Sequence, residues 1–224
     1  MRIIFVRHGE PNYELDCLTP LGQKQAKAAA ERLRAEGIEE IYSSPFGRAM
    51  ETAQAASDAL NIHPIQVLDF MHELYWGSAD GNPTFADGHP WDIASDLARR
   101  DWDLTRTDWP EHPYFINNRV TAEVERVARE TDAWLETLGY EREGAYYRCV
   151  RQDHEQHTVA LFCHGGSSSA ALARIFNLPF PYVCAFLHQP FTSLTTVRLT
   201  SRPGDKALPV MELLGDARHI EGIR

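Results

Sequence analysis

Two histidines follow apolar, strand-like runs at opposite ends of the sequence. Ile3-Ile4-Phe5-Val6 leads into Arg7-His8-Gly9-Glu10, and Val159-Ala160-Leu161-Phe162-Cys163 leads into His164-Gly165-Gly166. The turn after a buried strand holds side chains on a rigid backbone, where they can converge on a ligand. Because both histidines have this setting and each precedes a glycine, we expect one site that is built from both ends of the chain.

The tetrad Arg7-His8-Gly9-Glu10 resembles the signature of the histidine phosphatase superfamily, also called the phosphoglycerate-mutase-like family. Its companion motifs occur in the family's order and span nearly the whole chain, which makes the resemblance specific. They are Leu18-Thr19-Pro20-Leu21-Gly22 with Gln25-Ala26, Ser43-Ser44-Pro45-Phe46-Gly47-Arg48-Ala49 with Thr52-Ala53, Glu73 with Gly77, Asp80 and Gly81, His164-Gly165-Gly166, and Asp216-Ala217-Arg218-His219-Ile220. Asp80 stands where the family usually has Glu.

The resemblance implies phosphoryl transfer through a phosphohistidine intermediate at His8. This chemistry needs a nucleophile, cations for the phosphate oxygens and an acid for the leaving group. A neutral imidazole can attack phosphorus through one nitrogen if the other nitrogen is held as a donor. We therefore predict that His8 is the nucleophile, that Glu73 is the general acid, and that His164 is a further donor to the phosphoryl oxygens or the transition state.

Four residues are predicted to bind the phosphate. Arg7 and Arg48 offer forked guanidinium donors that match phosphate geometry. The amide of Gly165 lies where a helix is expected to begin, which suits an anion. The fourth residue, Asn12, is chosen because many family members carry a phosphate-binding Asn shortly after the tetrad. That Asn is out of register here, so Asn12 and its neighbour Tyr13 are equal candidates to replace it.

The segment after Glu73 favours a phosphatase. Cofactor-dependent mutases carry a Tyr-Gly-x-Leu-x-Gly-Leu-Asn-Lys-like run there, and residues 74–82 lack it. The preferred interpretation is a metal-independent phosphomonoesterase that acts on a small phosphorylated metabolite and needs no cofactor. The alternatives are a cofactor-dependent phosphoglycerate mutase and a catalytically weak protein that binds a phosphorylated ligand. A metallohydrolase is disfavoured because no His-x-x-x-His or CxxC pair offers a ligand set.

Several other polar residues have structural interpretations. Glu10 is expected to be a local hydrogen-bond partner, and His219 to be structural. Ser167-Ser168-Ser169 is interpreted as helix capping because no Gly-x-Ser-x-Gly elbow precedes it. Tryptophans are more often core than substrate platform, so at most one or two should line the pocket.

Alternating strand and helix signals must position these groups. They predict an α/β fold, a three-layer sandwich in which helices flank a mostly parallel central sheet. Thr19 is the expected N-cap of a helix that has Pro20 at its first position and ends at Gly37. A second helix is predicted from about Phe46 to Leu60, and a third should begin near Ser167. Strands are expected at 2–6, 39–43, 157–163, 192–199 and 208–214.

Residues 82–150 depart from this alternation. Four of the five tryptophans lie there, and apolar residues from Val120 to Leu138 recur at helical spacing. The segment resembles the family's variable insertion, which usually covers the active site. No Pro-, Gly- or Ser-rich linker flanks it. We therefore predict a single histidine-phosphatase-like domain over residues 1–224, with a helical cap insertion at about 82–150.

Composition limits the remaining functions. A net charge of −10 argues against nonspecific binding to nucleic acid or to an anionic membrane, and no apolar run approaches the roughly 20 residues of a membrane span. No secretory signal is visible, and the four scattered cysteines are expected to be free thiols in a reducing cytoplasm. The expected partner is the small phosphorylated substrate. The sequence does not identify that substrate, and it leaves a homodimer open.

Overall fold

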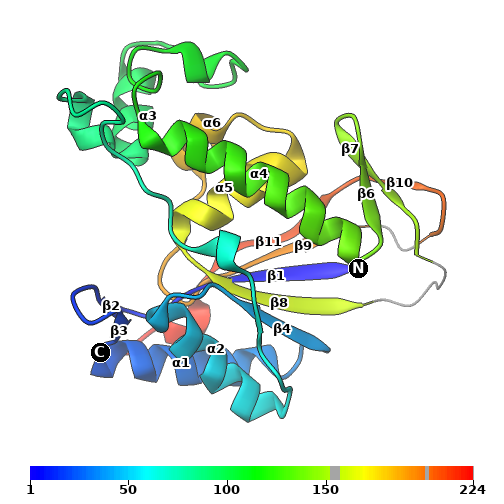
Figure 1. Ribbon diagram of the computed structural model, residues 1–224. Helices are drawn as coiled ribbons and strands as arrows, with labels where there is room; N and C mark the ends of the chain where they lie inside the picture. The colour runs from blue at the N-terminus through cyan, green and yellow to red at the C-terminus, as the bar shows by residue number, and fades with distance from the viewer. Residues whose placement is uncertain (152–156, 200–201, 224) are drawn as a thin grey trace.

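A six-stranded mixed sheet forms the centre of the computed structural model, which describes residues 1–151, 157–199 and 202–223. The strand order is β11-β9-β1-β8-β4-β5 (Figure 1). Strands β1, β8, β4 and β5 are parallel, whereas β9 is antiparallel to both of its neighbours. The bounds are Arg2–Arg7 (β1), Glu40–Ser43 (β4), Gln66–Val67 (β5), Thr158–Cys163 (β8), Leu194–Arg198 (β9) and Val210–Asp216 (β11). The predicted α/β class with a mostly parallel sheet is confirmed.

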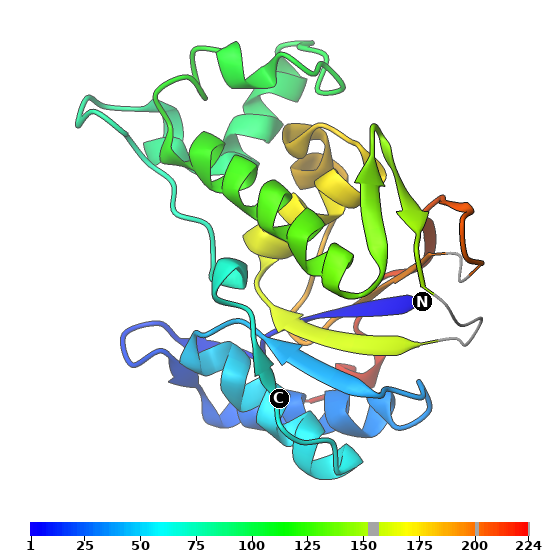
Figure 2. The ribbon, with the colours of Figure 1, turned by 45° about the vertical axis from the view of Figure 1, so that its right-hand side comes forward.

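Helices cover both faces of this sheet (Figure 2). On one face lie α1 (Pro20–Leu33) and α2 (Gly47–Leu60), and on the other lie α4 (Arg119–Thr137), α5 (Gly165–Phe176) and α6 (Phe180–Phe186). Side chains alternate along β1: Ile4 packs with the first group, and Ile3 and Phe5 pack with the second. Both faces of β1 are therefore buried, which explains its unbroken apolar sequence.

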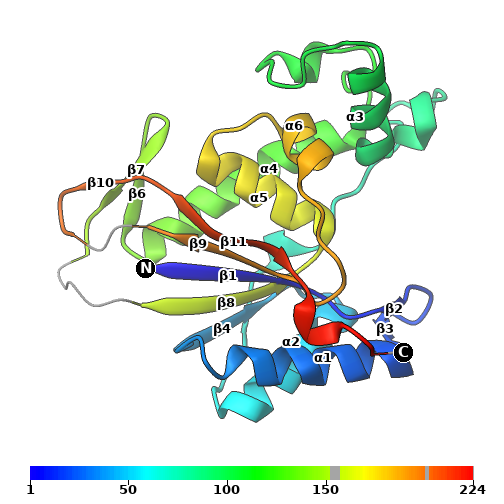
Figure 3. The same cartoon turned by 180° about the vertical axis from the view of Figure 1, so that it is seen from behind.

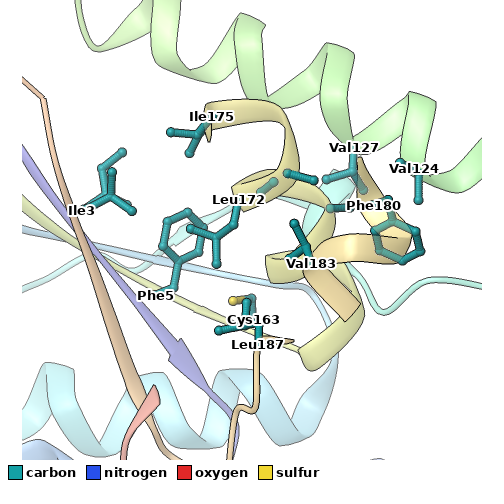
Figure 4. Packing of buried hydrophobic residues seen from close by; sticks show 14 of the residues in the cluster. Ile3, Phe5, Val124, Val127, Cys163, Leu172, Ile175, Phe180, Val183 and Leu187 are labelled. Carbon is teal, nitrogen blue, oxygen red and sulfur yellow. The ribbon is translucent and has the colours of Figure 1, made fainter. Parts of the chain in front are cut away.

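The second face contains the larger core. Figure 4 shows Ile3 and Phe5 of β1 beneath Leu172 and Ile175 of α5, with Val183 of α6 beside them. All five side chains are at most 2% exposed. Since α5 begins directly after β8, this packing also fixes the start of α5 against the carboxyl ends of the strands.

The segment 82–150 packs against α5 and α6, and its longest helix, α4, lies along α5 on the same face of the sheet (Figure 1). It contains η2 (Phe85–Gly88), α3 (Pro90–Arg99), η3 (Trp109–Glu111) and α4, which is the helix that the apolar stripe from Val120 predicts. Its last part forms β6 (Tyr140–Glu143) and β7 (Tyr146–Cys149), which pair with β10 (Lys206–Ala207) in a second sheet. Sequence analysis did not predict that sheet. The division into one domain with a cap stays a prediction.

The first predicted helix differs from α1 at its end. Thr19 caps it by accepting from the Gly22 amide, and Pro20 is the first helical residue, both as expected. The helix ends at Leu33 rather than at Gly37, because the following residues turn more tightly and Gly37 has a φ of +65°. The remaining short elements are β2 (Pro11–Asn12), β3 (Cys17–Leu18), η1 (Asp69–Met71) and η4 (Arg218–Ile220).

The C-terminal segment of the described chain packs near α1. After β11 the chain turns through η4 towards α1, which Figure 3 shows from behind. All four cysteines are free thiols, three of them buried. Across the described ranges, no helix combines the length and the apolar character that crossing a membrane requires.

The loop after β1 packs against α1 through two glycines. A Cβ atom on Gly9 would lie 2.6 Å from the carbonyl oxygen of Gly22, and a Cβ atom on Gly22 would overlap the carbonyl oxygen of Glu10. Both are backbone atoms, which cannot rotate away as a flexible side chain could. Glycine at both positions therefore lets the helix touch the loop that carries His8.

We expect Gly22→Ala to destabilise the protein, although alanine is the better helix former by about 1 kcal/mol. The overlap with Glu10 must be relieved by backbone shifts, which typically cost about 1–3 kcal/mol. Chemical denaturation measures the change in the free energy of unfolding. Lys27→Ala, at an exposed site of the same helix, is the control and should stay within about 0.5 kcal/mol of the parent. A Gly22→Ala protein more stable than the parent would contradict this account.

Candidate active site

The site lies at the carboxyl ends of β1, β8 and β4. Arg7 pairs with Cys163 at the end of the parallel β1–β8 ladder, and the amide of His8 donates to the carbonyl of Cys163 at 3.0 Å. The next residues of the two strands are thereby neighbours: the ring centroids of His8 and His164 are 5.1 Å apart. The structure thus brings together the two histidines that lie at opposite ends of the sequence.

His8 is held as a neutral imidazole with one nitrogen committed. Its Nδ1 lies 2.7 Å from the carbonyl oxygen of Gly9, an acceptor, so Nδ1 carries the hydrogen and donates. The lone pair is consequently on Nε2. Burial is the main reason that the pKa of His8 falls to about 3; the Gly9 hydrogen bond opposes the shift, and the charges of Arg7 and Arg48 add to it. This tautomer and charge state are those that nucleophilic attack through Nε2 requires.

Two buried guanidinium groups flank His8. Arg7 Nη1 donates to the carbonyl of Gln189 at 2.5 Å, and Arg48 Nη1 donates to Asp16 Oδ1 at 2.5 Å. The Nε atoms of both arginines are buried and have no hydrogen-bond partner in the described part of the chain. Burial lowers the pKa of Arg7, but an arginine stays charged at neutral pH. An anion bound here would supply the missing acceptors.

His164 presents a second unused nitrogen. Its Nε2 lies 2.8 Å from Ser44 Oγ, which also accepts from the amide of Phe46. A hydroxyl group has one hydrogen and two lone pairs, so Ser44 Oγ can donate to His164 Nε2 while it accepts from Phe46; in that tautomer Nδ1 carries the ring hydrogen. That Nδ1 is buried without a partner among the residues that the structure describes. Burial, with His8 beside it, lowers the pKa of His164 well below its ordinary value.

Glu73 is bound to the start of α5. Its Oε1 accepts from the amides of Leu74 at 2.9 Å, Gly166 at 3.0 Å and Ser167 at 3.1 Å. Burial raises the pKa of Glu73, although these amides and the two arginines oppose the shift. The raised pKa suits a group that must hold a proton. The contact needs glycine at 166, since a Cβ atom there would overlap Glu73 Oε1.

The amides at the start of α5 therefore have two different roles: some bind Glu73, and one is left for the predicted anion. The sequence predicts an anion at this N-terminus, but Gly166 and Ser167 give their amides to Glu73. Gly165 is the first residue of α5, so its amide takes no part in the helical ladder. A Cβ atom on Gly165 would lie 3.9 Å from Arg7 Nε. Gly165 is thus the residue of this turn that borders the guanidinium group.

Asn12 is turned away from the site. Its Oδ1 accepts from the amides of Glu14 and Leu15, both at 3.1 Å, and so closes a turn in the loop between β2 and β3. Tyr13 instead lies over the site, with Arg48 Cζ 5.4 Å from its ring centroid. Of the two candidates for the missing asparagine, the geometry places Tyr13, not Asn12, against Arg48.

The other polar residues have structural contacts. Glu10 Oε1 accepts from Thr19 Oγ1 at 2.9 Å, at the cap of α1. His219 Nε2 lies 3.1 Å from Thr192 Oγ1. Ser168 Oγ donates to the carbonyl of His164 at 2.6 Å, within the first turn of α5. The contacts of Glu10 and His219 agree with their structural interpretations. The interpretation of Ser167-Ser168-Ser169 as helix capping is wrong, because the N-cap of α5 is His164, without a side-chain cap, and the three serines lie inside the helix.

Sequence reasoning missed three residues that hold the site. Gln189 orients Arg7 through its carbonyl, and Phe191 lies 4.5 Å from Arg7 Cζ, measured to the ring centroid. Asp16 holds Arg48 and also accepts from the amide of Gly47 at 2.7 Å. The available signal for Gln189 and Phe191 was the predicted strand at 192–199. Once that strand pairs antiparallel with β1, its start must lie beside the end of β1.

A cavity of about 380 Å³ opens above these groups. Arg7, Glu73 and Gly165 reach it, whereas His8 is 1% exposed beneath. Its described lining is Arg7, Tyr13, Glu73, Trp76, His89, Trp91, Gly165, Cys184, Ala185, Phe186, Leu187, His188 and Gln189. The cavity therefore has a charged floor and walls rich in rings.

The lowered pKa of His8 predicts a pH-dependent stability. Its pKa of about 3 in the folded protein lies below the ordinary value near 6.5. The unfolded chain therefore binds a proton at His8 more readily than the folded protein does. The free energy of unfolding is unaffected by His8 above pH 6.5 and decreases as the pH falls from 6.5 towards 3. By pH 5 the loss amounts to about 2 kcal/mol. His8→Asn should therefore lose less stability between pH 7.5 and pH 5 than the parent, as measured by urea unfolding. His188→Asn, at an exposed histidine, should keep the parent's dependence; identical curves for all three proteins would refute the assignment.

Comparison with known proteins identifies relatives. Residues 3–135, more than half of the 224-residue chain, match the model of the histidine phosphatase superfamily (branch 1). The 2,3-bisphosphoglycerate-dependent phosphoglycerate mutase of Thermoplasma acidophilum is 37% identical over 68 residues, which are 26% of this chain and 34% of that protein. The chain thus spans about a third of the length of the first curated relatives that it matches.

Solved structures agree over almost the full length. The native mycobacterial glucosyl-3-phosphoglycerate phosphatase superposes with a TM-score of 0.66 at 25% identity, covering 96% of this chain and 98% of that one. A mutant of the phosphoserine phosphatase of Entamoeba histolytica, in complex with phosphoserine, gives 0.60 at 20% identity and covers 98% of both chains. Given the match to the family model over more than half of the chain and this shared fold, the chain belongs to the histidine phosphatase superfamily (branch 1).

Proposed function

We propose that this protein is a phosphomonoesterase that hydrolyses a small phosphorylated metabolite through a phosphohistidine at His8. The observation that carries the proposal is the state of His8: Nδ1 donates to the Gly9 carbonyl, and the imidazole is buried and neutral. Nε2 therefore keeps the lone pair that attack on phosphorus needs. Arg7, Arg48 and His164 lie near His8, and each has a buried nitrogen without a described partner that could donate to a phosphoryl oxygen.

The reaction proceeds in two transfers. In the first, His8 Nε2 bonds to phosphorus, the bond from phosphorus to the ester oxygen breaks, and Glu73 gives its proton to that oxygen. In the second, Glu73 takes a proton from water, the water oxygen bonds to phosphorus, and the bond from phosphorus to nitrogen breaks. Arg7, Arg48 and His164 hold the phosphoryl oxygens in both steps. Inorganic phosphate and free His8 result.

A phosphatase and a mutase would both begin by transferring the phosphoryl group to His8. A mutase would return the phosphoryl group to a substrate hydroxyl instead of to water, and the Thermoplasma relative is named as such an enzyme. The mycobacterial neighbour at 25% identity is named as a phosphatase. The segment after Glu73, which lacks the mutase-like run, favours hydrolysis here. A phosphate-release assay over a panel of monoesters, with and without 2,3-bisphosphoglycerate, separates the two activities.

Metal independence and location are parts of the same proposal. Over the described ranges, no group of three or more His, Cys, Asp or Glu side chains is arranged to hold a metal ion. We expect phosphate release to be unchanged by a chelator. The four free thiols fit a reducing compartment such as the cytoplasm.

We expect His8→Asn to reduce phosphate release by about a thousandfold or more. The asparagine amide can still donate to the Gly9 carbonyl, but it offers no nucleophilic lone pair. Rapid acid quenching after mixing with a labelled monoester should trap an acid-labile phosphoenzyme in the parent and none in the variant. Circular dichroism checks that the variant is folded. Retention of the labelled species in folded His8→Asn would place the nucleophile elsewhere.

Glu73→Gln should slow hydrolysis of alkyl esters far more than hydrolysis of an activated aryl ester. An alkyl oxygen leaves as a strong base and needs a proton, whereas an activated aryl oxygen leaves without one. We expect a loss in kcat/KM of about a hundredfold or more on the alkyl ester, and less than about tenfold on the aryl ester. The glutamine oxygen can still accept from the three amides that hold Glu73.

The alkyl ester also tests the pKa of Glu73. Since the acid must be protonated, kcat/KM of the parent should fall as the pH rises through the raised pKa of Glu73, and Glu73→Gln should lose this alkaline limb. Glu10→Gln, at a carboxylate that contacts Thr19, is the control and should keep both the rate and the limb. Equal losses on the two esters would assign Glu73 a positioning role.

A further inference from the structure

We propose that the alcohol portion of the substrate carries an uncharged aromatic ring that packs on a wall formed by Trp76, His89 and Trp91. The inference rests on the proposed function, because it concerns the leaving group of that reaction. We refer to these three side chains as the ring wall.

The ring wall is pre-formed by contacts among its members. The centroids of Trp76 and His89 are 5.3 Å apart with planes at 87°, and those of Trp76 and Trp91 are 6.4 Å apart at 82°. His89 and Trp91 are 5.4 Å apart. Edge-to-face contacts of this kind stabilise one another, so the wall offers fixed aromatic faces. An aromatic ligand then loses little free energy to ordering of the protein.

The ring wall adjoins the phosphate-binding floor directly. A single point, the position of a Cβ atom on Gly165, lies 3.8 Å from Trp91 Cζ2 and 3.9 Å from Arg7 Nε. Trp76 follows Glu73 by three residues in the same segment, and both line the cavity. An ester oxygen that faces Glu73 therefore directs its substituent towards these rings.

Exposed rings extend the wall along the rim of the cavity. Tyr13 is 67% exposed, Phe186 44% and Trp76 36%, and all three line the cavity. Large side chains that are exposed around a concave site mark a surface that a ligand covers. A planar ring can stack on such faces and remove apolar area from water on both of its own faces.

The charges of the side chains that line the cavity argue against an alcohol portion that carries a carboxylate or a second phosphate. Arg7 is the single arginine or lysine among the described lining residues, and it faces the phosphate; the nearest carboxylate is Glu73. His89 Nδ1 lies 3.0 Å from Asp92 Oδ2, although the geometry is not that of a hydrogen bond, so a carboxylate already lies beside this ring. A carboxylate or second phosphate against the ring wall would lose water without gaining a cation.

An alcohol portion with a quaternary ammonium group fits the ring wall less well than one with a flat, neutral ring. Quaternary ammonium groups are bound in cages in which rings face one another across the cation. Trp76 meets the other two rings edge to face, and His89 and Trp91 are tilted by 41°, all at centroid distances of 5.3–6.4 Å, which leaves no such space between them. The chemistry that remains is a neutral, flat group.

Two esters of matched size and leaving-group basicity test the proposal. In the parent, kcat/KM for 2-phenylethyl phosphate should exceed that for 2-cyclohexylethyl phosphate by about tenfold, the effect expected of one stacking contact. In Trp91→Leu this ratio should fall to about one, because leucine keeps an apolar contact but has no aromatic face. Inhibition by vanadate, which occupies only the phosphate floor, should be unchanged.

A second tryptophan supplies the matched control. Trp102 lies outside the cavity lining and packs against His112, so Trp102→Leu should keep the parent's ratio. If Trp91→Leu does not fold, Trp76→Leu at the half-exposed member of the wall replaces it, with the same expected loss of the ratio. Circular dichroism and vanadate inhibition identify a folded variant.

The outcomes separate this inference from the proposed function. Turnover of both ring esters at equal kcat/KM in the parent would overturn the aromatic class while leaving the phosphatase in place. A preference for 3-phosphoglycerate or choline phosphate over the phenylethyl ester would likewise overturn it, in favour of an anionic or cationic alcohol. Absence of turnover on every ester, with no acid-labile phosphoenzyme, would instead refute the proposed function and this inference with it.

Discussion

The rest of the structure depends on the parallel pairing of β1 with β8. This ladder sets Arg7 opposite Cys163 and joins the His8 amide to the Cys163 carbonyl. Side chains alternate between the faces of a strand, so a slip of one residue would send the core residues of β1 to the wrong helices. The two apolar faces of β1 therefore fix the register, and the register brings His8 beside His164. Hydrophobic packing in this way determines the geometry of a polar site.

Burial beneath the helices then sets the protonation states. It keeps His8 and His164 neutral and raises the pKa of Glu73. The cost is three buried polar nitrogens without described partners: Arg7 Nε, Arg48 Nε and His164 Nδ1. An unmade hydrogen bond of a buried group is destabilising by about 1–3 kcal/mol. A phosphate would relieve this cost at all three, so substrate binding and stability are coupled at the same atoms.

Hydrogen bonds from neighbouring residues orient Arg7, Arg48 and Glu73 in the absence of a ligand. Asp16 engages one nitrogen of Arg48 and the Gln189 carbonyl engages one nitrogen of Arg7, so each guanidinium is oriented while a further donor stays unused. Glu73 takes the amides of Gly166 and Ser167, which fixes its carboxyl group beside the cavity. The tryptophans differ from one another: Trp109 and Trp134 are core, while Trp76 and Trp91 line the cavity, within the one or two that the sequence led us to expect.

Apolar runs, the Thr19 cap and the ordered motifs are local signals, so the residues alone were enough to predict a mostly parallel sheet and the polar groups at the ends of its strands. The sequence also supplied His8, Arg7, Arg48, Glu73 and His164 as one set. The contact of Tyr13, rather than Asn12, with Arg48 could not be predicted in this way, and neither could the contacts of Gln189 and Phe191 with Arg7. These depend on which way a loop turns and on which strands pair. Such choices are made by contacts between segments that are distant in the chain, and no local pattern of residues encodes them.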